Sequence, residues 1–471
     1  LRIEINGDRR NPMHVFSQAL KPALPVSRTD WTSIAARNIA SIVTGTNVVT
    51  MAAEHPWTAG QQVIMATSGT LPAVAGDPLT AHTPLYVLAP GPTTMQLARS
   101  PGGAAIDFTG TGTGTHTLKA ASWSNASSAL YFPAGVHVVG RVFGLGSGVT
   151  VYVDRGAIVI GGWSLIGTDN VRLTVPGVLG GMFATSEEVA AIGDFNERIR
   201  YSMFLGYDGV KFSFANDIEL ATVLGQPFFC SFLGLNTWTD VAILSPWYWE
   251  LNGPDFAVRE FGVDHTASAT RVFAWCGDDT FTIGESVSYC DLTIDQCFAV
   301  TMANSCFHLG YWSQPPTGFP TRIQNSHAMH LGIVDTNADG LFPVRGGNTI
   351  FKGWSDGFVG EENYGRFLVT IDELDVWGPI RSRVWHLGNR LYPFGIFDRA
   401  RKGQIANWTI SGLRVHQTPG QVSIIESLDA SNTPHHIAIT DSSIGGTPLT
   451  AGNWTTFVSM SPEAYQITVN G

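Results

Sequence analysis

The chain has 471 residues, of which 44% are hydrophobic and only 14% are charged. A hydrophobic fraction of this size supports a large core and excludes a mainly disordered chain. The net charge of −11 disfavours nucleic acid as a partner, because an acidic surface repels phosphate backbones. No apolar run approaches the roughly 18 residues that a membrane span needs.

The N-terminal quarter is expected to be all β. Residues 1–7 and the run from Met13 predict two strands around an Asn-Gly turn. Residues 38–121 are rich in Thr, Gly, Ala and Pro and contain alternating runs at Gln62–Met65 and Leu85–Leu88. These features predict a small β-module set into, or beside, a β-sandwich, so that residues 1–125 form an N-terminal part.

Short apolar runs recur from about Leu130 onward, with starts often about 20 to 30 residues apart. Because one such coil cannot bury its own apolar face, the coils are expected to stack. We therefore predict a right-handed parallel β-helix over residues 126–471. A β-propeller is the alternative, but its blades repeat at about 40 to 50 residues. The runs begin at Val149, Val171, Val241, Val272, Leu292, Ile350, Leu368, Trp408 and Ile437.

Helical signals are scarce, and the best candidate is the short segment 186–191. The five cysteines show no CxxC spacing, which argues against a zinc or redox motif. We interpret them as buried core thiols, with one disulfide among them as the alternative.

Acidic residues gather beside aromatic ones between Trp247 and residue 284. Asp278 and Asp279 precede a Thr-Phe-Thr-Ile run, and neighbouring carboxylates raise one another's pKa. At a turn that enters a strand, both can face one cleft and supply the protonated acid and ionised base of glycoside hydrolysis. The alternative is a solvated Gly-Asp-Asp turn.

Flat aromatic rings beside carboxylates suit a sugar, whose ring face is apolar and whose rim is hydroxylated. Candidates for sugar contacts are therefore the aromatic residues Trp249, Trp275, Tyr311 and Trp312, and His308 for a hydrogen bond at the rim. Each Trp taken alone is also a common core residue in a β-helix.

Several phrases resemble the polygalacturonase-like β-helix enzymes. Tyr131-Phe-Pro-Ala-Gly-Val-His137, Val149-Thr-Val-Tyr-Val-Asp-Arg-Gly-Ala-Ile-Val-Ile-Gly-Gly162 and Val178-Leu-Gly-Gly look like their first coils. Cys276-Gly-Asp278-Asp279 is similar to the Asp pair of glycoside hydrolase families 28 (polygalacturonases) and 49 (dextranase and isopullulanase). Cys306-Phe-His308-Leu-Gly-Tyr-Trp312 and the segment from Ile444 look more like family 49. The resemblance covers residues 130–465 loosely.

In family 49 the resemblance implies that the first residue of the pair, Asp278, is the proton donor. Both families add an earlier Asp from the preceding coil. Asp264 is the nearest candidate, but its spacing to Asp278 is shorter than in either family, so Glu260 and Asp255 remain alternatives. The Gly-His-Gly and Arg-x-Lys motifs with which family 28 binds uronates do not occur here, which argues against a galacturonan substrate.

The sequence thus predicts an inverting glycoside hydrolase that cleaves a neutral or weakly charged, α-glucan-like polysaccharide. The alternatives are a tailspike-type glycan-binding protein with slow or no cleavage, and a polysaccharide lyase. Phrases in residues 38–121 resemble small β-repeats of phage tail proteins, which would imply a homotrimer on a virion. Otherwise we expect a secreted monomer.

No cofactor is expected. Residues 335–340 loosely resemble the start of a calcium loop but lack its closing Glu, so a plain turn is predicted there. Because the chain begins with Leu1, we expect that an upstream segment was removed. The sequence therefore indicates neither the presence nor the absence of a signal peptide.

Overall fold

The structure is a computed structural model, and for part of the strands it describes the backbone alone. It describes residues 2–5, 8–14, 27–80, 83–165, 171–180, 204–206, 210–213, 217–219, 236–239, 242–245, 255–256, 265–276, 280–283, 290–301, 305–309, 320–330, 349–353, 368–377, 383–388, 406–420, 422–426, 435–460 and 465–470.

The chain divides into two compact units, residues 20–182 and residues 1–19 with 183–471. This division groups the N-terminal module with the first coils. It does not test the boundary after residue 125, which stays a prediction.

Within unit 20–182, six antiparallel strands close into a barrel in the order β4-β5-β8-β7-β6-β9. The alternating runs of the sequence become β6 and β7, where Val63, Met65, Leu85 and Val87 are buried. The apolar half of each alternating strand therefore fills the barrel. The strands are β4 (Arg37–Val43), β5 (Val48–Met51), β6 (Gln62–Thr67), β7 (Pro84–Leu88), β8 (Thr94–Ala98) and β9 (His116–Ala120).

The same unit holds the first coils of a parallel β-helix. β3 (Ser27–Asp30) pairs in parallel with β11 (Ser128–Phe132), which pairs in parallel with the next coil. The short helix α1 (Trp31–Ile34) follows β3, and its Trp31 ring stacks on Phe132 at 5.1 Å. The other strands of these coils are β10 (Ser122–Trp123), β12 (Gly135–Leu145), β13 (Thr150–Val153), β14 (Ala157–Leu165), β15 (Arg172–Thr174) and β16 (Val178–Gly180).

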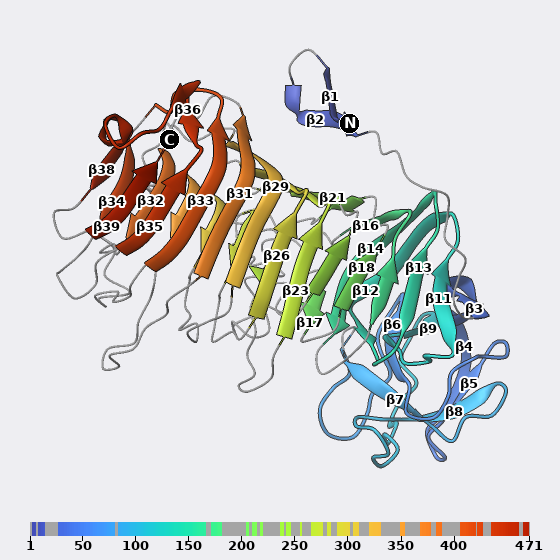
Figure 1. The fold of residues 1–471 in the computed structure, drawn as a ribbon. Coiled ribbons are helices and arrows are strands. Elements are labelled where there is room, and N and C mark those ends of the chain that lie inside the picture. The colour runs from blue at the N-terminus through green and yellow to red at the C-terminus, as the bar shows by residue number, and fades with distance from the viewer. Residues whose placement is uncertain are drawn as a thin grey trace, which may run out of the picture. The chain divides into compact units, whose positions relative to one another are not determined.

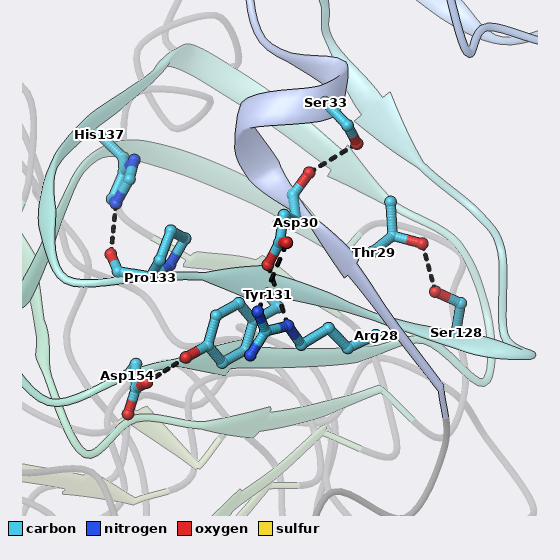
Figure 2. A network of polar contacts seen from close by, with 9 residues as sticks. All are labelled: Arg28, Thr29, Asp30, Ser33, Ser128, Tyr131, Pro133, His137 and Asp154. Atoms are coloured by element: carbon cyan, nitrogen blue, oxygen red, sulfur yellow. Dashed lines mark hydrogen bonds and ion pairs between the residues drawn. The ribbon is translucent and has the colours of Figure 1, made fainter.

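A polar network ties β3 to these coils (Figure 2). The Arg28 guanidinium lies 3.9 Å from the centre of the Tyr131 ring and forms a 3.0 Å ion pair with Asp30. The Tyr131 hydroxyl donates a hydrogen bond to Asp154 on the following coil. Burial, together with this bond, raises the pKa of Tyr131 to about 12.

The second unit begins with the antiparallel hairpin β1 (Arg2–Ile5) and β2 (Asp8–His14), as the Asn-Gly turn predicts. In the part of this unit that the structure describes from residue 204 onward, most strands stack in three parallel ladders (Figure 1). Parallel stacking at this repeat confirms the predicted parallel β-helix and excludes a propeller, which is antiparallel.

Ladder A contains β18 (Val210–Ser213), β20 (Asn236–Thr239), β23 (His265–Thr270), β26 (Cys290–Asp295), the first halves of β29 (Pro320–His330), β31 (Leu368–Trp377) and β33 (Ala406–Val415), then β35 (His435–Thr440) and β39 (Tyr465–Asn470). Ladder B contains β19 (Asp217–Glu219), β21 (Ala242–Ser245), β24 (Phe273–Cys276), β27 (Phe298–Thr301), the second halves of β29, β31 and β33, and β36 (Ser443–Ile444).

Ladder C contains β22 (Asp255–Phe256), β25 (Phe281–Ile283), β28 (Ser305–Leu309), β30 (Thr349–Gly353), β32 (Arg383–Gly388), β34 (Ser423–Glu426) and β38 (Val458–Met460). The remaining elements are β17 (Phe204–Gly206), β37 (Thr447–Pro448) and the short 3-10 helix η1 (Trp454–Thr456).

The core is built from rows of like residues, one from each coil. In ladder A the register aligns five buried isoleucines, and in ladder C it aligns the buried rings of Phe281, Phe307 and Phe351. The Phe rings stack with centroids 5.7 and 5.4 Å apart. Each coil thus buries its apolar side against its neighbours. The isoleucines are Ile294, Ile323, Ile371, Ile410 and Ile439.

Successive coils turn from ladder A to ladder B through one residue with positive φ. These six residues are Arg271, Gln296, Asn325, Glu373, Gly412 and Asp441, with φ between 42 and 65°. The residue after each of them is buried in every coil, and in two coils it is a serine. Ser326 Oγ, for example, accepts from Cys297 N at 3.1 Å and donates to Gln324 O. The corner is therefore the same local structure in these six coils.

All nine apolar runs of the sequence coincide with or overlap strands of the coils. Cys297 and Cys306 are buried and are not in disulfide bonds, and burial raises the pKa of Cys297 to about 12, which makes it unreactive. The core-thiol prediction is confirmed for these two. The side chains of Cys230, Cys276 and Cys290 and the helix candidate 186–191 lie outside the described residues. Among the helices that the structure describes, none is long and apolar enough to cross a membrane.

Candidate active site

The predicted Asp pair belongs to the connection between ladders B and C. Asp278 and Asp279 themselves lie outside the described residues, between Cys276, the last residue of β24, and Thr280, which precedes β25. Cys276 is the register partner of Thr301 on the next coil. The pair thus directly precedes strand β25, and its conformation stays a prediction.

Thr280 directly follows Asp279 and is bonded to the next coil. It is fully buried, its N–H donates to Ser305 O at 2.9 Å, and its hydroxyl donates to Val300 O at 2.9 Å. Both partners belong to the following coil. The residue directly after Asp279 is therefore held by two bonds to the next coil.

Trp275, predicted to contact sugar, is fully buried at the end of β24. It forms an apolar cluster with Val300, against which Phe273, Phe298 and Met329 pack. This burial favours a packing role for Trp275. Because its ring is not exposed, the predicted contact of Trp275 with sugar is not supported.

Three residues were candidates for the third carboxylate, and they differ in their position relative to the ladders. Asp255 is in β22 of ladder C, where its register partner is Thr282, three residues after Asp279. Asp264 precedes β23 and so leads into ladder A, and Glu260 lies between β22 and β23; both are outside the described residues. The fold thus places Asp255 on the preceding coil and on the ladder that the Asp pair enters.

The register of ladder C also forms a polar row that sequence reasoning found only in part. Thr282, His308, Lys352 and His386 are successive register partners. Their positions alternate with the buried row of Phe281, Phe307 and Phe351. Lys352 and His386 were missed, because no sequence signal shows that residues this far apart share a row. Only the strand register brings them beside His308.

Trp249, Tyr311 and Trp312 lie outside the described residues, as does the calcium-like segment 335–340. In the part of the chain that the structure describes, no group of three or more His, Cys, Asp or Glu side chains is arranged to hold a metal ion.

These features define a parallel β-helix protein with a barrel set before its coils. No protein-family model matches the sequence, and no curated protein matches it. Three solved structures similar to it are Dex49A from Penicillium minioluteum, the Family 28 exopolygalacturonase of Yersinia enterocolitica, and the Gp54 tailspike of Acinetobacter baumannii bacteriophage AP22 in complex with a capsular saccharide.

Dex49A shares 12% identity over 87% of this chain and 73% of its own, with a TM-score of 0.48. The exopolygalacturonase shares 10% over 95% of this chain and 98% of its own, with a TM-score of 0.38. The tailspike shares 9% over 90% of this chain and 66% of its own, with a TM-score of 0.26. At these identities no residue role can be transferred to this chain.

Proposed function

We propose that this protein is a polysaccharide-cleaving glycoside hydrolase whose site lies along ladder C, at the turn that carries Asp278 and Asp279. The observation that carries the proposal is the placement of acidic positions on neighbouring coils. The Asp pair leads into β25, and Asp255 belongs to the adjacent strand β22. Carboxyl groups on neighbouring coils are what a two-carboxylate mechanism needs.

In this mechanism Asp278 is the general acid and gives its proton to the glycosidic oxygen as the bond to the anomeric carbon breaks. A second carboxylate, from Asp279 or Asp255, takes a proton from a water that attacks the opposite face of the sugar. One water is consumed, and the anomeric configuration is inverted. Inversion requires about 6.5–9.5 Å between the acid and the base, which leaves room for the water.

The row of Thr282, His308, Lys352 and His386 supports binding of a polymer along the coil axis. These side-chain types donate hydrogen bonds to hydroxyl or carboxylate oxygens of a sugar. At a strand repeat of about 4.8 Å, the row offers a donor type on each of these four coils. We propose a neutral or weakly charged glycan as substrate and an extracellular location.

A second candidate is a tailspike-type protein that binds bacterial glycan with slow or no cleavage. The closed barrel of residues 37–120 favours it, because hydrolysis on the coils does not need such a module. Under this alternative the protein would be part of a virion.

The test is Asp278→Asn, assayed for new reducing ends on a panel of neutral glucans and bacterial capsular glycans. Loss of a general acid lowers turnover by about 10² to 10⁴. The matched control is Asp372→Asn, which changes an exposed carboxylate of ladder A. Near-full activity of Asp278→Asn would remove the assignment. Absence of new reducing ends with the unaltered protein, despite glycan binding, would favour the tailspike alternative.

A further inference from the structure

Ladder B carries an exposed aromatic cluster well away from the Asp pair. Trp377 ends β31 and is 39% exposed, which is unusual for the largest apolar side chain. The His416 ring stacks on it with centroids 3.8 Å apart and an angle of 14° between the planes. Two flat rings are thus held parallel at the surface.

Hydrogen bonds fix the orientation of both rings. Trp377 Nε1 donates to His327 Nδ1 at 3.2 Å, and His416 Nε2 lies 2.7 Å from Asp375 Oδ1. Since Nδ1 of His327 accepts this hydrogen bond, the ring N–H is on Nε2, which leaves a donor beside the rings. The His327 side chain is 47% exposed and that of His416 is 39% exposed. We call Trp377, His416, His327 and Asp375 the ladder B platform.

The platform continues an apolar row that starts beside the proposed active site. Trp275, Val300, Met329 and Trp377 are successive register partners. The first two are buried, and Trp377 is exposed. Three strand spacings of about 4.8 Å place Trp377 about 14 Å from Trp275 along the coil axis.

The row has no side chain on the coil after His416. His416 N donates to Val376 O, and Gly445 N donates to Val415 O in the same way. Gly445 therefore follows His416 in the row and adds no side chain to it. The aromatic pair is the last part of the row that offers rings.

We infer that the ladder B platform is a second glycan-binding site, which holds a pyranose unit of the polysaccharide at a distance from the cleavage point. Pre-oriented aromatic surface with a polar rim matches a sugar, which combines an apolar face with a ring of hydroxyls. The His327 N–H and the Asp375 carboxylate supply a donor and an acceptor at that rim. The choice of a glycan as ligand rests on the proposed function.

The test is affinity electrophoresis of the full chain, in the Asp278→Asn background, through gels that contain dextran, pullulan or polygalacturonate. We expect at least one polymer to retard this parent. Trp377→Ala should raise the apparent Kd for that polymer about tenfold. Trp377→Phe, which keeps a flat ring, should retain most of the binding. Ile158→Ala is the matched control, since Ile158 is 41% exposed on β14, which belongs to neither ladder B nor ladder C.

A parent that no polymer retards, or a Trp377→Ala variant retarded as strongly as the parent, overturns the inference. A second readout separates it from the proposed function. With Asp278 intact, Trp377→Ala should raise KM for the polymer and leave kcat unchanged, whereas Asp278→Asn lowers kcat. Unchanged turnover in Asp278→Asn together with weakened binding in Trp377→Ala would remove the acid assignment and keep the platform.

Discussion

Asp255 and Thr282 are register partners in ladder C, so Asp255 lies one coil before the turn of Asp278 and Asp279. Asp264, the nearer residue in the sequence to that turn, instead leads into ladder A. Proximity along the chain and proximity in the fold therefore favour different residues for the third carboxylate.

Asp255→Asn should lower turnover of the cleaved polymer by about 10² or more, because it removes the acidic residue that the register places opposite the strand after the Asp pair. Asp264→Asn serves as its comparison and should change turnover less than about tenfold. Initial rates from a reducing-end assay measure both. A larger loss in Asp264→Asn than in Asp255→Asn would assign the third carboxylate to Asp264 instead.

Thr280→Val should lower the free energy of unfolding by about 1–3 kcal/mol, because the buried hydroxyl no longer donates to Val300 O. Thr280→Ser keeps the hydroxyl and should lose less. If the bond also positions Asp279, kcat falls in Thr280→Val and recovers in Thr280→Ser. Urea unfolding and rate measurements check the two effects, and equal behaviour of the two variants would show that the hydroxyl does not matter.

Phe307→Ala should destabilise the unit of residues 183–471 by about 3–5 kcal/mol, the range for truncating a buried aromatic ring. Phe307 stacks between Phe281 and Phe351, so its loss leaves a cavity that both neighbours line. Phe307→Leu fills part of that space and should cost less. The midpoint of guanidinium unfolding, followed by circular dichroism, gives the difference; a small effect of Phe307→Ala would mean that the coils collapse around the gap.

Tyr131 should make stability depend on pH in the alkaline range. Its pKa is raised from 10.0 to about 12 in the fold, mainly by burial. The folded state therefore holds the phenol proton more tightly than the unfolded chain. The resulting stability is fully present below pH 10 and is lost as the pH rises toward 12.

Tyr131→Phe should weaken this alkaline loss of stability, as seen in urea midpoints measured on either side of pH 10. The pKa of Tyr152 is also raised to about 12, so part of the loss should persist until both residues are replaced. An unchanged pH dependence in the double variant would assign the loss to other groups.

The apolar runs predicted the coils well because each run is a strand that buries one side, and that pattern is local. The Ile row and the Phe stack follow from it once the coils are in register. The register itself is not local. Lys352 and His386 lie in the same row as His308, but the connections between the strands differ in length, such as residues 310–319 and 331–348. Their alignment could therefore not be predicted from the sequence. The exposure of Trp377 and the burial of Trp275 could not be predicted either, since both occupy the same row of ladder B and differ only in their exposure in the fold.

The repeated corner with positive φ also bears on how such a chain can change. The link from ladder A to ladder B is two residues long at 240–241, 271–272, 296–297 and 441–442, and three residues long at 214–216. The links on either side of ladder C vary freely in length. The length of the links thus varies far more around ladder C than at the corner. New specificities can evolve by lengthening those loops while the bend that sets the pitch of the solenoid stays constant.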